Sequence, residues 1–204
     1  MDRRIGTTAR LGKKPAVGQP VTAFMTSETS SKRRAQTLPA DIAVGLFAGL
    51  VATQVTNLAQ RPLQWATPDS VGRQEKRVRP GGSSSLVAAR QAAYGLDCSP
   101  DRQNMELLGK VIHFGIGMAW GPVYGLLRRH GGLGPFGAAL ASGAAMSLVL
   151  DEGVVPALGL SAPNRDYPAF THARGFLAHL VYGAAAALAA EGFGRLVGRT
   201  PRPA

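Results

Sequence analysis

Residues 42–59 read IAVGLFAGLVATQVTNLA, a stretch of 18 residues without a charged side chain. Three further uncharged stretches cover residues 111–127, 133–150 and 175–190. A transmembrane helix needs about 20 consecutive apolar residues, within a usable range of about 17–25. The last stretch reaches Val197 if Glu191 and Arg195 lie at the membrane surface. The sequence therefore predicts an all-α integral membrane four-helix bundle, with spans at about 42–60, 111–128, 133–150 and 175–197.

A soluble helical bundle is the alternative, because short uncharged stretches also occur in buried core helices. None of the four stretches carries the charged stripe that a water-facing helix needs. Small residues instead recur at every fourth position, which lets helix backbones approach closely in lipid. We therefore favour the membrane interpretation. The glycines of these stripes are predicted to pack the helices, and they are Gly45, Gly49, Gly117, Gly121, Gly125 and Gly183.

Charge is distributed unevenly along the 204 residues, which carry 23 Lys and Arg against 12 Asp and Glu. Residues 1–40 contain many basic, Ser and Thr residues and no long apolar periodicity, so we predict a disordered basic tail there. The transmembrane domain then covers residues 41–198. It includes a long loop at 61–110 with a short amphipathic helix at about 85–96. The single cysteine, Cys98, excludes an internal disulfide and a cysteine-rich zinc site.

Basic residues also orient the predicted bundle. Lys32, Arg33 and Arg34 directly precede the first span, and Arg128 and Arg129 lie between the second and third. The positive-inside rule places both regions, and therefore both termini, in the cytoplasm. The tail also matches a twin-arginine export signal or an organelle transit peptide, but further membrane-length stretches follow it. We expect it to contact the lipid bilayer and no nucleic acid, because it lacks a DNA-binding fold.

In this topology most polar residues of the spans gather in one layer near the outer membrane surface. Polar residues inside a membrane are candidates for ion or proton pathways. The alternatives are that charged residues near span ends reach the headgroups and that histidines form helix-to-helix hydrogen bonds. The predicted polar cluster consists of Asn57, His113, Asp151, Glu152, Arg174 and His179.

The patterns that common cofactors require are missing from the sequence. It contains no His-x-x-x-His or Glu-x-x-His pair, so we expect neither a zinc-protease site nor a di-iron carboxylate site. The glycines at 131, 132 and 134 follow no predicted strand, which disfavours nucleotide binding. We therefore predict no catalytic residues, no metal and no cofactor.

Several short motifs follow one another along the chain. They are Gly45–Leu50, Arg61-Pro62, Asp97-Cys98-Ser99, His113-Phe114, Tyr124-Gly125, Val155–Pro163 and His179-Leu180-Val181. In this order they resemble the YagU-like family of small bacterial inner-membrane proteins over about residues 42–197, although the basic tail is longer than the family leads us to expect. The resemblance implies an integral inner-membrane location, and it implies no reaction and no catalytic residues.

Two functions follow from these patterns, and a third, a membrane-embedded hydrolase or metalloenzyme, lacks a supporting motif. The first is a non-enzymatic membrane protein that acts through helix–helix packing with a second copy or another membrane protein, as the small-residue stripes suggest. The alternative is a small transporter or pH-responsive element built on the histidine and acid cluster, since histidine titrates at about pH 6.5. A wet cavity joining the histidines to the acids favours transport, whereas a dry, closed bundle favours packing.

Overall fold

The computed structural model describes residues 21–79 and 81–196, with side chains from Pro39 onward. The chain divides into two compact units between Leu38 and Pro39, and the second unit contains the predicted membrane domain. The first helix, α1 (Val21–Trp65), begins inside the predicted disordered tail. The segment from Val21 to Leu38 contains neither Gly nor Pro, so no residue there interrupts a helix. The predicted disorder is therefore not confirmed for residues 21–40, and residues 1–20 lie outside the described part.

The described residues form helices joined by short turns, with no strand among them, which confirms the predicted all-α class. After α1 come α2 (Asp69–Val78), α3 (Ser84–Gly95) and α4 (Arg102–His130). A continuous rod follows, made of α5 (Pro135–Met146), the π-helical segment η1 (Ser147–Val154) and the short α6 (Val155–Ala157). The 3-10 turn η2 (Asn164–Asp166) then leads into α7 (Ala169–Leu196).

The segment 61–110, predicted as a long loop, is largely helical. Helix α1 continues through Pro62 to Trp65, and α2 and α3 occupy much of the rest. Helix α3 lies where the amphipathic helix at 85–96 is predicted, and the Ser83 side chain caps it by accepting from the amide of Leu86. The Asp101 carboxylate caps α4 by accepting from the amide of Asn104 at 2.8 Å. Local capping residues therefore set these helix starts.

Three helical segments are long and apolar enough to cross a membrane: Pro39–Trp65, Pro135–Ala157 and Ala169–Leu196. They match the first, third and fourth predicted spans and indicate a multi-pass membrane protein. Helix α4, which contains the second predicted span, is not among them. Its uncharged stretch includes His113 and several glycines, which lower its mean hydropathy. The four-span prediction is therefore not confirmed.

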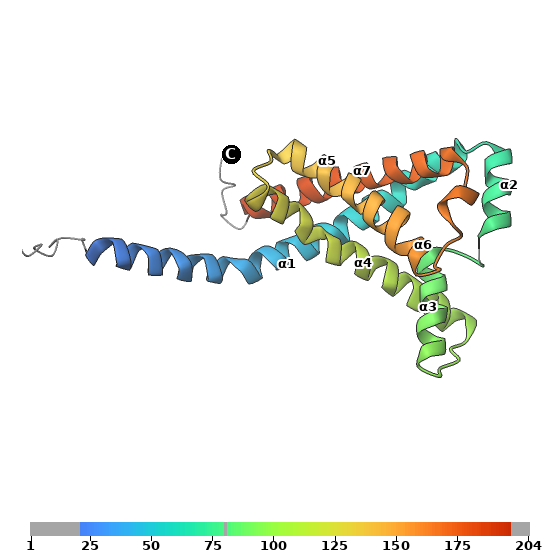
Figure 1. Cartoon of the computed structure of the whole chain (residues 1–204), viewed down its shortest axis with the longest axis horizontal. Coiled ribbons are helices and arrows are strands. Elements are labelled where there is room, and N and C mark those ends of the chain that lie inside the picture. The colour runs from blue at the N-terminus through green and yellow to red at the C-terminus, as the bar shows by residue number, and fades with distance from the viewer. Residues whose placement is uncertain (1–20, 80, 197–204) are drawn as a thin grey trace, which may run out of the picture. The chain divides into compact units, whose positions relative to one another are not determined.

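The second unit is built from α1 after Pro39, α4, the α5–η1–α6 rod and α7, which lie side by side (Figure 1). Helix α5 packs along α7, and α4 packs against α5, α7 and α3. Helices α2, α3 and α6 lie at one end of this bundle, which we call the α2 end (Figure 1). The turn between α4 and α5 lies at the other end, which we call the α4–α5 end.

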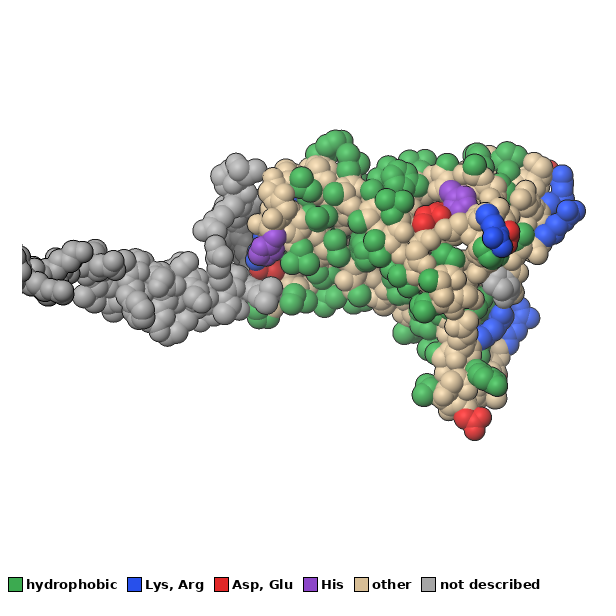
Figure 2. Space-filling view, in the orientation of Figure 1, with side chains coloured by type: hydrophobic (Ala, Val, Ile, Leu, Met, Phe, Trp, Pro, Cys, Tyr) green, Lys and Arg blue, Asp and Glu red, His purple; other side chains and the backbone are tan. Residues whose placement is uncertain are grey.

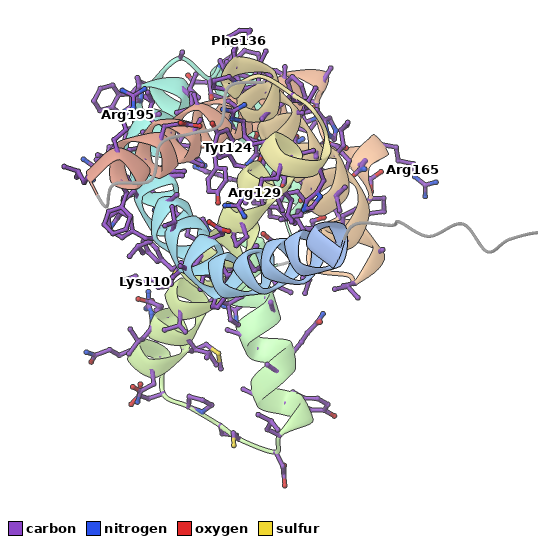
Figure 3. All side chains as sticks on the ribbon, turned by 90° about the vertical axis from the view of Figure 1, so that its left-hand side faces the viewer. Lys110, Tyr124, Arg129, Phe136, Arg165 and Arg195 are labelled. Carbon is purple, nitrogen blue, oxygen red and sulfur yellow. The ribbon has the colours of Figure 1, made fainter. Side chains whose placement is uncertain are left out.

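Small residues form the interior of this bundle, and large apolar residues face outward. The buried core contains Ala48, Ala52, Ala138 and Ala186, together with Tyr182. Hydrophobic side chains cover much of the middle of the face seen in Figure 2, whereas Lys and Arg side chains gather at the α2 end. Phe136, which is 77% exposed, points outward from α5 (Figure 3). Large exposed apolar patches on a folded chain mark a surface that contacts lipid or protein.

The predicted packing glycines bring α1 and α4 into close contact. A Cβ on Gly45 would lie 2.6 Å from Cα of Pro122, and a Cβ on Gly49 would lie 2.5 Å from the carbonyl oxygen of Gly117. A Cβ on Gly121 would collide with the carbonyl oxygen of Gly45. Gly45, Gly49 and Gly121 are therefore required by the contact, because no side chain fits between the two backbones, and a Cβ on Gly117 would collide with the Thr53 side chain.

A second close contact joins α5 to α7. A Cβ on Gly183 would collide with the carbonyl oxygen of Ala139 and would lie 2.9 Å from the amide nitrogen of Gly143. Gly143 is not among the predicted packing glycines. Conversely, a Cβ on Gly125 would meet open space, so this predicted glycine takes no part in a close helix contact.

Candidate functional site

The π-helical segment η1 directs two adjacent acids toward α7. A π-helix is rare and is frequently found at functional sites. Asp151 and Glu152 both lie in η1. Oε1 of Glu152 lies 2.6 Å from Nδ1 of His172, and Oδ2 of Asp151 lies 2.7 Å from Nε2 of His179. Two His–carboxylate pairs therefore connect the α5–η1–α6 rod to α7.

Both ring nitrogens of His172 face oxygen atoms. Nε2 lies 3.0 Å from the backbone carbonyl oxygen of Asn164, and Nδ1 faces the Glu152 carboxyl group. A carbonyl oxygen only accepts hydrogen bonds, so Nε2 carries a hydrogen. A further proton must lie between Nδ1 and Glu152, because a bare nitrogen lone pair would otherwise face a carboxylate. The His172–Glu152 pair thus holds one exchangeable proton.

His179 is bonded differently, because its second ring nitrogen has no partner. Nε2 contacts Asp151, whereas Nδ1 is buried without a hydrogen-bond partner. Protonation of Nδ1 would bury an unpaired charged donor, which costs more than burying an unpaired neutral acceptor. The surroundings therefore fit a neutral ring that donates from Nε2 to Asp151. Asp151, whose side chain is 45% exposed, then retains its negative charge.

Arg174 holds helix α2 against the beginning of α7. Its guanidinium donates to Oε1 of Glu75 at 2.7 Å and to Oγ1 of Thr67 at 2.7 Å. Thr171 also donates to Glu75 at 2.6 Å. Only 8% of the Glu75 side chain is exposed, so its charge depends on these partners for compensation. The contact attaches α2 to the membrane-spanning part of the chain.

An open cavity of about 390 Å³ lies beside these groups at the α2 end. Asp151, Glu152, His172, Arg174 and His179 all line it. The remaining lining is also largely polar and includes Gln60, Gln64, Ser83, Asn164 and Tyr167. Figure 2 shows histidine, acidic and basic side chains close together at this end. The arrangement can exchange protons with water and can bind a small polar solute.

The predicted polar cluster is only partly brought together. Asp151, Glu152, Arg174 and His179 line the cavity, whereas Asn57 and His113 are not in its lining. Oδ1 of Asn57 and Nε2 of His113 lie 3.1 Å apart and form a separate polar contact between α1 and α4. These two side chains lie on α1 and α4, which are packed by their glycines, and His113 also interacts electrostatically with His179 of α7.

Two functional residues are missing from the predicted cluster. His172 lies seven residues before His179, a spacing of about two helical turns that places both rings on one face of α7. Glu75 is an acid in the otherwise basic segment Arg73–Arg79 of α2. The helical spacing is a usable signal for His172, whereas Glu75 becomes recognisable only once α2 is identified as a helix.

Polar contacts at the α4–α5 end depend on arginine instead. The Tyr124 hydroxyl donates to Oε1 of Glu191 at 2.8 Å, and Nε of Arg128 lies 3.3 Å from the same oxygen. Arg129 forms an ion pair with Asp41. In Figure 3 Tyr124 and Arg129 lie among the helices, whereas Arg195 points outward. These contacts join α1, α4 and α7 where no histidine–acid pair occurs among the described residues.

No group of three or more His, Cys, Asp or Glu side chains in the described ranges could hold a metal ion. Comparisons with protein-family models, with curated proteins and with solved structures found no match. The apolar helices indicate a multi-pass membrane protein, and its function has to be inferred from the cavity itself.

Proposed function

We propose that this chain is a small four-span transporter of the bacterial inner membrane. Both termini lie in the cytoplasm, and the polar cavity opens to the other side. The observation that carries the proposal is the two His–carboxylate pairs, at 2.6 and 2.7 Å, in the wall of an open polar cavity. A small polar solute enters the cavity, and a proton is taken up or released as it binds. The chain performs no covalent chemistry on the solute and is not an enzyme.

The free-energy cost of placing ionisable side chains in membrane-spanning segments supports this function. Asp151 and Glu152 belong to one apolar segment, and His172, Arg174 and His179 belong to another. Ionisable residues in transmembrane segments are costly and mark solute pathways or proton relays. A bundle that serves only for packing does not need five such groups around one cavity.

Helix α4 is proposed as the fourth crossing because other helices satisfy its polar atoms. The Trp120 indole donates to the carbonyl oxygen of Ser142 at 3.1 Å. The Tyr182 hydroxyl donates to the carbonyl oxygen of Gly117 at 2.5 Å. A helix whose polar atoms are satisfied by its neighbours costs less to place in lipid, and α4 keeps the Val111, Ile116 and Leu126 side chains exposed as apolar surface. Arg128 and Arg129 at the α4–α5 end support a cytoplasmic location for that end.

The other predicted function, helix–helix packing with a second copy or another membrane protein, loses its main support. That prediction depends on small-residue stripes in excess of what the bundle itself needs. Gly45, Gly49, Gly117 and Gly121 form the α1–α4 contact, and Gly183 forms the α5–α7 contact. These stripes are therefore used within one chain, and they provide no observation in favour of a homo-oligomer or another membrane-protein partner.

Proton flux in liposomes tests the proposed function. The purified full chain is reconstituted with a trapped pH-sensitive dye, and small polar solutes, one charged (guanidinium) and one neutral (urea), are added outside so that proton flux coupled to their movement is detected. We expect wild-type flux above that of protein-free liposomes, with loss of flux in the double variant Asp151→Asn and Glu152→Gln. Glu106→Gln is the control, because Glu106 is exposed and lies outside the cavity lining. Equal flux in wild type, double variant and empty liposomes would contradict the proposal.

A further inference from the structure

Asp151 and Glu152, the two acids that line the cavity, differ from other paired acids in the kind of basic side chain they contact. Glu75 and Glu191 contact the guanidinium groups of Arg174 and Arg128. Asp151 and Glu152 contact imidazole rings instead. Arginine keeps its charge at every physiological pH, whereas histidine gains or loses its proton within that range. The cavity acids are therefore the ones whose partners can become uncharged.

The charges around the cavity balance only while the His172–Glu152 pair keeps its proton. Arg79 and Arg174 are positive, and both lie within 4 Å of Glu75, at 3.7 and 2.7 Å. Asp151 is negative beside a neutral His179, and the His172–Glu152 pair is neutral as a whole when protonated. Two positive charges then face the negative charges of Glu75 and Asp151. Loss of the shared proton leaves the group of residues with one excess negative charge.

From this balance we infer that the cavity binds a small monovalent organic cation and releases one proton to water as it does so. The inference rests on the proposed function and names the class of solute. The cation replaces the proton that His172 and Glu152 share, so the charge of the occupied cavity does not change. The bond that breaks is the one holding this proton to Nδ1 or to the carboxyl group, and a water molecule accepts the proton. No oxidant, reductant or other reactant is needed.

The groups that face the pairs are compatible with a bound cation. Arg174 is held by Glu75 and Thr67, and Arg79 is directed to the same carboxylate. The Tyr167 ring packs against the His172 ring in an edge-on contact, with ring centroids 6.4 Å apart. An aromatic ring beside a desolvated cation contributes a favourable cation–π interaction. From the α5–η1–α6 rod only Asp151 and Glu152 contribute charge to the lining, and both are acids.

Guanidinium and urea form a matched pair of probes for this inference. Both are small and planar and donate hydrogen bonds, but only guanidinium is charged. The detergent-solubilised full chain is mixed with each probe at constant ionic strength in weakly buffered solution near pH 7, and proton release is followed with a dye. We expect about one proton released per bound guanidinium and none with urea. By the same linkage, guanidinium affinity falls by up to about tenfold per pH unit as the solution becomes more acidic.

Two isosteric variants test whether guanidinium-linked proton release depends on the acids that line the cavity. Glu152→Gln removes the shared proton and is expected to abolish guanidinium-linked proton release. Asp151→Asn retains an acceptor for His179 but removes one negative charge from the balance, so it is expected to weaken guanidinium binding and to lower proton release at a fixed guanidinium concentration. Glu106→Gln is expected to behave as wild type. If either cavity variant is not recovered folded, as judged by its helical circular dichroism, the other provides the answer.

The results separate this inference from the proposed function. Urea binding as tightly as guanidinium, or guanidinium binding without proton release, would overturn the cation inference while dye-detected flux in liposomes still supported a transporter. Unchanged release in both cavity variants would also overturn it. If the wild type shows neither proton flux in liposomes nor guanidinium binding, the proposed function itself is wrong.

Discussion

Single residues decide how closely the helices of this bundle approach. Gly121 and Gly125 are one helical turn apart on α4, yet their surroundings differ. A Cβ on Gly121 would collide with the carbonyl oxygen of Gly45 and lie 2.7 Å from the amide nitrogen of Gly49. A Cβ on Gly125 would have nothing within 4 Å. The obstacle at Gly121 is backbone, which cannot move aside as a flexible side chain can.

Gly121→Ala is therefore expected to destabilise the folded chain by about 1–3 kcal/mol, the usual cost of overpacking. Gly125→Ala serves as the matched control and is expected to be neutral or to gain up to about 1 kcal/mol from helix propensity. The measurement is unfolding in mixed micelles of increasing denaturing-detergent content, followed by circular dichroism. Equal midpoints for the two variants would show that the α1–α4 contact is not as close as described.

The sequence predicts such stripes but cannot say which members are in contact. Gly121 and Gly125 continue the same four-residue repeat, and only the point at which α1 crosses α4 distinguishes them. Glu75 shows the same limit for polar residues. Its importance depends on Arg174, which lies 99 positions further along the chain, and no local pattern links the two.

At the scale of elements, one buried carboxylate attaches α2 to α7, and the Gln74 amide of α2 also donates to the carbonyl oxygen of Asp166. Helix α2 is strongly polar, with Glu75 as its buried residue. Glu75 receives hydrogen bonds from Arg174 and Thr171. Removing one partner of a buried ion pair typically costs about 3–5 kcal/mol, because the other charge is left uncompensated. This contact is consequently the main attachment of α2 to α7.

Glu75→Ala is expected to release α2 from α7 while leaving the membrane helices folded. Hydrogen exchange followed by mass spectrometry measures this directly, as faster exchange of α2 amides with no change in α5 and α7. Glu106→Ala is the control, since the exposed Arg102–Glu106 pair contributes about 0–1 kcal/mol. Slow α2 exchange in the Glu75 variant would show that other contacts hold this helix.

The elements themselves are only partly predictable. Uncharged length identifies α1, the α5–η1–α6 rod and α7, because lipid imposes it on any spanning helix. No helix-start, helix-stop or periodicity signal in the sequence predicts the π-helical geometry of η1, yet Asp151 and Glu152 lie within it and both meet histidines of α7. The sequence therefore predicts the acids as polar residues and leaves their partners open.

For the whole molecule, the number of helices that cross the membrane determines whether two exposed residues, Cys98 and Arg195, lie on the same side of it. Cys98, the only cysteine of the chain, is exposed in the connection between α3 and α4. Arg195 is exposed at the end of α7 and points outward (Figure 3). Three helices lie between these positions: α4, the α5–η1–α6 rod and α7. If all three cross the membrane, the two positions lie on opposite sides; if α4 does not cross, they lie on the same side.

We expect opposite sides, with Cys98 outside and position 195 in the cytoplasm. Spheroplasts expressing the wild type, or the Cys98→Ser and Arg195→Cys double variant, are treated with a membrane-impermeant maleimide before and after permeabilisation. The wild type is expected to be labelled at once and the double variant only after permeabilisation, whereas Cys98→Ser alone remains unlabelled. The same labelling pattern for both positions would mean that α4 does not cross. The reverse pattern would retain four crossings and place the cavity on the cytoplasmic side, where a bound cation would leave rather than enter the cell.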